Sequence, residues 1–200
     1  MVDLTAGVAS YPRVSYAYEL GGDKVGAKFA LTHALQISQS PADTAFARQY
    51  LGELAFNSGD LTTAYTNFTQ GLRDDPAYLP LLAGRARVEA ARGQSQTALA
   101  DWQEVTDRLP QTTYLIEYAD LLASLGRERE AQTQYAIVDA TAKLFRARGA
   151  NVDLELSLFN ADHGRGVEAL ATATAEVARR QSIQVEDAYA WSLHAGGQDE

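Results

Sequence analysis

The chain has 200 residues, of which 46% are apolar and 22% charged, an ordinary soluble composition that can bury a substantial core. Its formal net charge is −9, so it lacks the basic stripe on which binding to nucleic-acid phosphates or anionic membranes depends. The absence of cysteine excludes disulfides, thiol catalysis and zinc–thiolate sites.

The two ends of the chain bear on targeting and on whether the sequence continues. The amino-terminal run "MVDLTAGVAS" has no basic region and no long apolar stretch, which argues against a signal peptide in these residues. No run approaches the roughly 20 apolar residues of a membrane span, so we expect no membrane insertion. The final run "LHAGGQDE" stops where a further helix should begin, and we expect a fragment of a longer protein. The compartment, cytoplasmic or exported, stays open.

From the amino terminus onwards, a glycine interrupts the apolar pattern every 33 to 38 residues. A period near 34 residues is typical of stacked structural repeats. Six glycines mark the period: Gly22, Gly59, Gly93, Gly126, Gly164 and Gly197.

Residue size follows fixed offsets from these glycines. Seven residues before each stands a small residue, five after stands alanine, and nine after stands a mostly large residue, as in Gly52, Ala64 and Phe68 around Gly59. This pattern predicts two antiparallel helices joined at the glycine, with small residues allowing close approach and the large one filling the space between pairs. Pro76 and Pro110 are expected to end two second helices.

The run "YLGELAFNSGDLTTAYTNFTQGLRDDP", with Leu51, Gly52, Gly59, Ala64, Phe68 and Pro76, resembles the tetratricopeptide repeat family, and the later run "LELSLFNADHG" resembles bacterial members of unassigned role. The resemblance implies an all-α, right-handed superhelix of stacked helix pairs. Residues 1–200 would then form one domain of five repeats plus part of a sixth.

Two departures from the period carry structural expectations. The 38-residue spacing before Gly164 predicts a longer helix within "REREAQTQYAIVDATAKLFRARG". Arg85 occupies a position that is apolar in the other repeats, and Glu89, one helical turn further on, is its expected partner.

Catalytic chemistry finds little support in the sequence. The three histidines lie in separate repeats, and no phosphate-binding glycine loop is present, so we expect no enzyme, cofactor or metal. One alternative remains open, in which Asn160, Asp162 and His163 of "FNADHGRG" bind a metal or polar ligand. The commoner use of such residues is to cap a helix end.

The first helix of each repeat is expected to line a concave groove. The groove is mixed in character, which suits an extended peptide or partner helix with apolar anchors and some positive charge. Tyr16 and Glu19 would extend it. The candidate groove residues are Phe46, Gln49, Glu53, Phe56, Asn57, Arg87, Ile116, Asp120, Leu158 and Asp162.

These residues predict a non-enzymatic protein-interaction scaffold whose partner is a protein or peptide. The lysines and asparagines with which related repeats hold a terminal carboxylate are missing, so that ligand class is not expected. Alternatives left open are a ligand- or peptide-sensing module of a larger exported or regulatory protein, a solvated wall with no ligand, and self-association.

Overall fold

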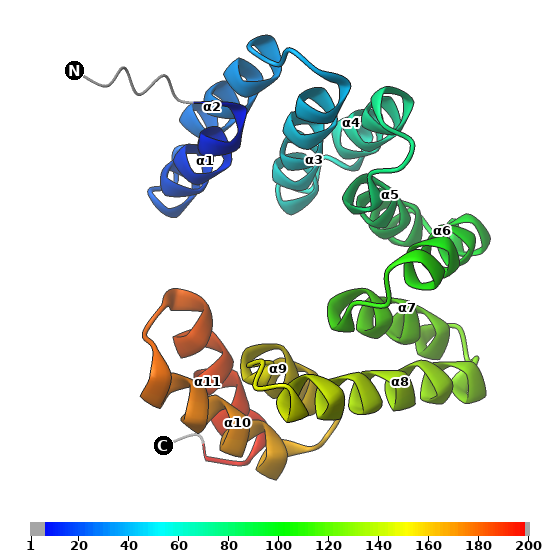
Figure 1. Ribbon diagram of the computed structural model, residues 1–200, viewed down its shortest axis with the longest axis vertical. Coiled ribbons are helices and arrows are strands. Elements are labelled where there is room, and N and C mark those ends of the chain that lie inside the picture. The colour runs from blue at the N-terminus through cyan, green and yellow to red at the C-terminus, as the bar shows by residue number, and fades with distance from the viewer. Residues whose placement is uncertain (1–6, 199–200) are drawn as a thin grey trace. The chain divides into compact units, whose positions relative to one another are not determined.

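The computed structural model describes residues 7–198, and within this range the chain forms eleven α-helices, one short 3-10 helix and no strand (Figure 1). The first six residues lie outside the described range. They belong to the run "MVDLTAGVAS", in which no signal peptide is expected. The prediction of an all-α chain is confirmed.

The helices fall into two compact units, which divide between Pro110 and Gln111. In the first unit they are the 3-10 helix Val8–Ser10, α1 (Tyr11–Leu20), α2 (Lys24–Gln36), α3 (Pro41–Asn57), α4 (Leu61–Asp74), α5 (Leu79–Ala91) and α6 (Ser95–Arg108). In the second unit they are α7 (Thr112–Ser124), α8 (Glu128–Ala147), α9 (Asp153–Asp162), α10 (Gly166–Arg179) and α11 (Ile183–Ala195). Whether residues 1–200 act as one domain stays a prediction.

Each helix pair closes at one of the predicted glycines. All six have φ between 71° and 80°, the left-handed region that only glycine enters without strain, so the predicted turns are confirmed. At Gly59, for example, the Asp60 N–H donates to the Ala55 carbonyl at 2.9 Å, which satisfies the end of α3. The Asp60 carboxylate then accepts the Thr63 N–H at 3.0 Å and begins α4.

The size pattern around the turns is confirmed by burial. The alanines that follow each turn by five residues are all fully buried: Ala27, Ala64, Ala98, Ala131 and Ala169. The small residues seven before each turn are buried as well, except Ala190, which is exposed because the described chain has no helix after α11.

Phe68 shows how the pattern works, because its ring lies between Gly52 of α3 and Gly84 of α5. A Cβ atom at either glycine would overlap the ring. The glycines therefore let three helices close around one large side chain, which is 1% exposed.

Within each unit most helices pack against the next one along the chain, as α1 does against α2, α4 against α5 and α9 against α10. Within the first unit α3 and α5 lie side by side, with α4 and α6 behind them (Figure 1). Within the second unit α9 contacts both α7 and α11. No helix in residues 7–198 is long and apolar enough to cross a membrane.

The predicted long helix is confirmed: α8 has 20 residues, against 14 in α4, α6 and α10. No proline ends it. The connector to α9 is instead fixed by ion pairs, in which Arg146 and Arg179 each donate to the Asp153 carboxylate at 2.9 Å. Burial opposes ionisation of Asp153, but these two arginines lower its pKa on balance.

Candidate functional site

A cavity of about 270 Å³ opens on α3 and α5, the first helices of consecutive pairs. Phe68 and Gly84 form its floor, so the close packing that seals the core also shapes this surface. Four predicted groove residues surround it: Glu53, Phe56, Asn57 and Arg87. The structure therefore brings these four side chains together from two repeats.

A second cavity of about 380 Å³ lies between α1 and α3. It exists because α1 hardly touches α3 directly, and the first hairpin is joined to α3 through α2 and the 3-10 helix. Tyr16 and Glu19 line it together with Tyr50, and Glu53 and Asn57 border both cavities. We call the residues of α1, α3 and α5 that line the two cavities the inner face.

The inner face carries charges of both signs. The Gln49 amide donates to the Glu53 carboxylate at 2.8 Å, and the Tyr78 hydroxyl donates to the Gln49 carbonyl oxygen at 2.6 Å, which fixes this acid in place. The guanidinium carbon of Arg87 lies 5.9 Å from the centre of the Trp102 ring. A bound molecule would therefore meet an anchored carboxylate and an anchored guanidinium on either side of an apolar floor.

Aromatic rings extend the apolar part of the inner face along α3. Phe46 packs edge-on against Tyr50, with ring centres 4.9 Å apart. Burial, followed by the nearby charge of Glu53, raises the pKa of Tyr50 above its ordinary value of 10.0. Tyr50 is not among the predicted groove residues, although it lies one turn after Phe46 on the same helix face.

The four predicted groove residues of the second unit are placed differently. Ile116 and Leu158 are half-buried on α7 and α9. Asp120 accepts a hydrogen bond from the Tyr135 hydroxyl at 2.6 Å, and Asp162 accepts one from the Trp191 indole at 2.7 Å. Both carboxylates thus tie one helix to another within the unit.

The alternative ligand trio does not converge. The His163 ring packs between Tyr135 and Phe159, and its Nε2 lies 3.0 Å from the Asp120 carboxylate, while Asp162 turns to Trp191. No group of three or more histidine, aspartate or glutamate side chains in residues 7–198 could hold a metal ion. Each member of the trio has its own structural surroundings instead.

No protein-family model matches the chain, and no curated protein matches it in sequence. Its structure is similar to a tetratricopeptide repeat protein of Parabacteroides merdae, with 17% identity, a TM-score of 0.54, and 96% of this chain and 74% of that one covered. It is also similar to a thermophilic TPR protein of Thermus thermophilus, at 17% identity, a TM-score of 0.64, and 94% and 100% coverage.

A third similar structure is human IFIT1, solved as a dimer with PPP-AAAA, with 10% identity and a TM-score of 0.69. The match covers 96% of this chain but only 51% of IFIT1. At these identities the likeness concerns the fold alone. With its glycine turns, buried alanines and adjacent helix pairs, the chain has the fold of a tetratricopeptide repeat solenoid.

Proposed function

We propose that the protein is a non-enzymatic scaffold whose inner face binds an extended peptide or a partner helix. The observation that carries the proposal is the meeting of Glu53, Phe56, Asn57 and Arg87 around one cavity. These residues come from two different repeats, and none of them belongs to the fully buried core.

The chemistry of the inner face specifies its occupant. A cavity of about 270 Å³ holds one apolar side chain but not a whole helix, so a peptide would anchor there and continue across α1 and α3. Glu19 and Glu53 favour a basic residue next to that anchor, and Arg87 favours an acidic one on the other side. Within the second unit, Ile116 and Leu158 are proposed as apolar contacts for a partner.

The experiment is selection of binders from a random peptide library, followed by affinity measurements on variants. Phe56→Ala removes the apolar wall and Arg87→Glu reverses the charge, so each should weaken selected peptides by about tenfold or more, the loss typical of a contact at the centre of an interface. Arg129→Glu, an exposed charge reversal on α8, is the matched control. Thermal melts check that every variant is folded.

Peptides that bind the Phe56→Ala and Arg87→Glu variants as tightly as the unchanged protein would contradict an inner-face site. Because IFIT1 was solved with PPP-AAAA, that oligonucleotide is tested in parallel. Preferential binding of the oligonucleotide would replace the peptide proposal. The second candidate function is a sensing module of a larger exported or regulatory protein. A groove between α2 and α4, lined by Lys24 and Lys28, favours it.

A further inference from the structure

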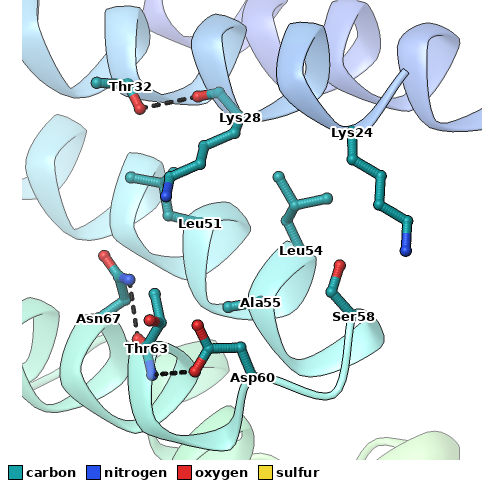
Figure 2. Close-up of a pocket in the computed structure, with 10 residues that line it drawn as sticks. All are labelled: Lys24, Lys28, Thr32, Leu51, Leu54, Ala55, Ser58, Asp60, Thr63 and Asn67. Atoms are coloured by element: carbon teal, nitrogen blue, oxygen red, sulfur yellow. Dashed lines mark hydrogen bonds between the residues drawn. The ribbon is translucent and has the colours of Figure 1, made fainter. Parts of the chain in front are cut away.

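A separate groove opens over α3, between α2 and α4 (Figure 2). Its volume is about 320 Å³. We call it the outer groove; it is lined by Lys24, Lys28, Thr32, Leu51, Leu54, Ala55, Ser58, Asp60, Thr63 and Asn67. It shares only Leu54 with the inner face.

The outer groove is apolar at its base and cationic along one edge. Leu51, Leu54 and Ala55 of α3 form the base, and the two lysines reach over it from α2, with Leu54 between them (Figure 2). Lys24 and Lys28 are four residues apart and so project from the same face of α2.

Neither ammonium group has a carboxylate within ion-pair distance among residues 7–198. The acid of the groove, Asp60, already accepts the Thr63 N–H at the start of α4. Hydrogen bonds from Thr63 are the main cause that lowers the pKa of Asp60, and Lys28 contributes least. The two cations are therefore available to an anion that enters the groove.

The second unit has a groove at the matching place, between α8 and α10, which are the second helices of consecutive pairs as α2 and α4 are. Its charges differ from those of the outer groove. It has a volume of about 430 Å³ over α9, between α8 and α10. There Arg165 reaches the Asp139 carboxylate at 3.1 Å and Arg146 reaches the Asp153 carboxylate at 2.9 Å, so both arginines that line that groove are neutralised by the chain itself. Of these two grooves, the one lined by Lys24 and Lys28 is the one whose cations have no ion pair among residues 7–198.

We propose that the outer groove binds a small single-chain amphiphile, with its apolar tail on Leu51 and Leu54 and its anionic headgroup between Lys24 and Lys28. A volume of about 320 Å³ corresponds to roughly ten water molecules, the lower end of small-molecule sites. A partner helix would need a far larger contact area than this groove offers. Charge and size together therefore favour an amphiphile over a protein.

The test is titration of the full chain with sodium octanoate and with octyl phosphate, followed by the amide signals of α2, α3 and α4 in NMR spectra. Both probes carry the tail and an anionic headgroup, and the tighter one distinguishes carboxylate from phosphate sources. Octylamine, with the same tail and a positive headgroup, and acetate, with no tail, should not bind measurably.

Substitution of both lysines, Lys24→Gln with Lys28→Gln, should weaken octanoate by about tenfold, as expected for two partly solvated charge contacts. The control is Lys143→Gln on α8, which removes the third lysine of the chain and should leave affinity unchanged. Since all three lysines are exposed, these variants keep the fold. The proposal is overturned if neither anionic probe binds, if octylamine binds equally well, or if the double variant keeps full affinity.

Discussion

Two junctions, one in each unit, involve the same positions of the repeat. They differ in how the large side chain nine residues after the turn glycine is accommodated. Glu53 and Asp120 each lie six residues before a turn glycine, and Phe68 and Tyr135 each lie nine after it. In the first unit the Phe68 ring is enclosed by glycines, and the Glu53 carboxylate borders a cavity. In the second, the Tyr135 hydroxyl donates to the Asp120 carboxylate at 2.6 Å.

The two sites differ in the ring and in its neighbours: Phe68 lies against Gly52, whereas in the unit of Tyr135 the matching residue before the turn is Ala119. Phenylalanine fills its space by shape alone and makes no demand on the nearby acid, which then faces the inner surface. Tyrosine must satisfy its hydroxyl when it is 7% exposed, and it takes the acid as its acceptor. The same repeat position therefore lines a cavity in one unit, where we propose a ligand contact, and joins two helices in the other.

The largest expected effect on the free energy of unfolding is at Phe68, where packing depends on shape. Gly84→Ala places a Cβ against the Phe68 ring, which cannot retreat because Gly52 lies on its other side. Overpacking of this kind costs about 1–3 kcal/mol, whereas the gain in helix propensity is about 1 kcal/mol, so the free energy of unfolding should fall. Urea unfolding measures the change.

A second substitution shows whether the clash is the cause. Phe68→Leu combined with Gly84→Ala should destabilise less than the sum of the two single changes, because the smaller side chain leaves room for the methyl group. A Gly84→Ala variant that is as stable as the unchanged protein would show that shape does not hold this junction.

The next largest effect on the free energy of unfolding is at Tyr135, whose hydroxyl donates a hydrogen bond to Asp120. Tyr135→Phe removes the donor to Asp120 and should lower the free energy of unfolding at neutral pH by about 1 kcal/mol. Tyr189→Phe on α11, where the ring is half-buried, is the matched control.

The same variant has a pH signature. Burial, followed by the hydrogen bond to Asp120, raises the pKa of Tyr135 above its ordinary value of 10.0. The folded state therefore favours the neutral phenol, and this contribution to stability is complete below pH 10 and lost as pH rises beyond it. The unfolding free energy of Tyr135→Phe should fall less steeply above that pH; an identical slope would contradict the role of the hydroxyl.

The smallest expected effect on stability concerns Glu89, a buried acid on α5. Glu89 is 5% exposed, and its Oε2 atom has no hydrogen-bond partner in the described structure. Burial, followed by the charge of Asp101, raises its pKa above the ordinary 4.5. The contribution of Glu89 to stability is then greatest while the group is protonated, and it falls as pH rises from about 4.5 through the folded-state pKa.

Glu89→Gln should remove this loss and make the protein slightly more stable at neutral pH. The comparison is made by urea unfolding at acidic and neutral pH, with Glu104→Gln, an exposed residue of α6, as the control. Destabilisation by Glu89→Gln at neutral pH would mean that the weak contact with Arg85, at 3.9 Å, outweighs the cost of burial.

Much of the fold could be predicted from the sequence because the contacts within a helical hairpin join residues that are close in sequence. The distance from Gly59 to Ala64 or Phe68 is fixed by helical geometry, and the turn is fixed by the need for a positive φ. Gly149 was missed, although it has φ of 77° at the end of α8, because no alanine follows it at the repeat offset.

Contacts between helices were harder to foresee. Glu89 was the expected partner of Arg85, but the bidentate hydrogen bonds go to Asp101 of α6, at 2.7 and 2.8 Å. A carboxylate on the facing helix can meet both guanidinium nitrogens, whereas one on the same helix approaches from the side. Sequence spacing shows neighbours on one helix but not the rotation of the next.

The candidate site was predicted in part for the same reason. Glu53, Phe56 and Asn57 share one helix face, so spacing alone placed them together. The roles of Asp120 and Asp162 depend on Tyr135 and Trp191, which lie 15 and 29 residues further along the chain. Whether the ten predicted groove residues bind a partner stays a prediction.

The length of α8 has a consequence for how such chains diversify. Its 20 residues exceed the 14 of α10 by more than one helical turn, yet the turns at Gly126 and Gly164 keep the common geometry. The surplus ends in a connector clamped by the Asp153 carboxylate. Extra residues at the end of a second helix can therefore be accommodated within that repeat. The length of a single repeat can then change during evolution while the others keep theirs.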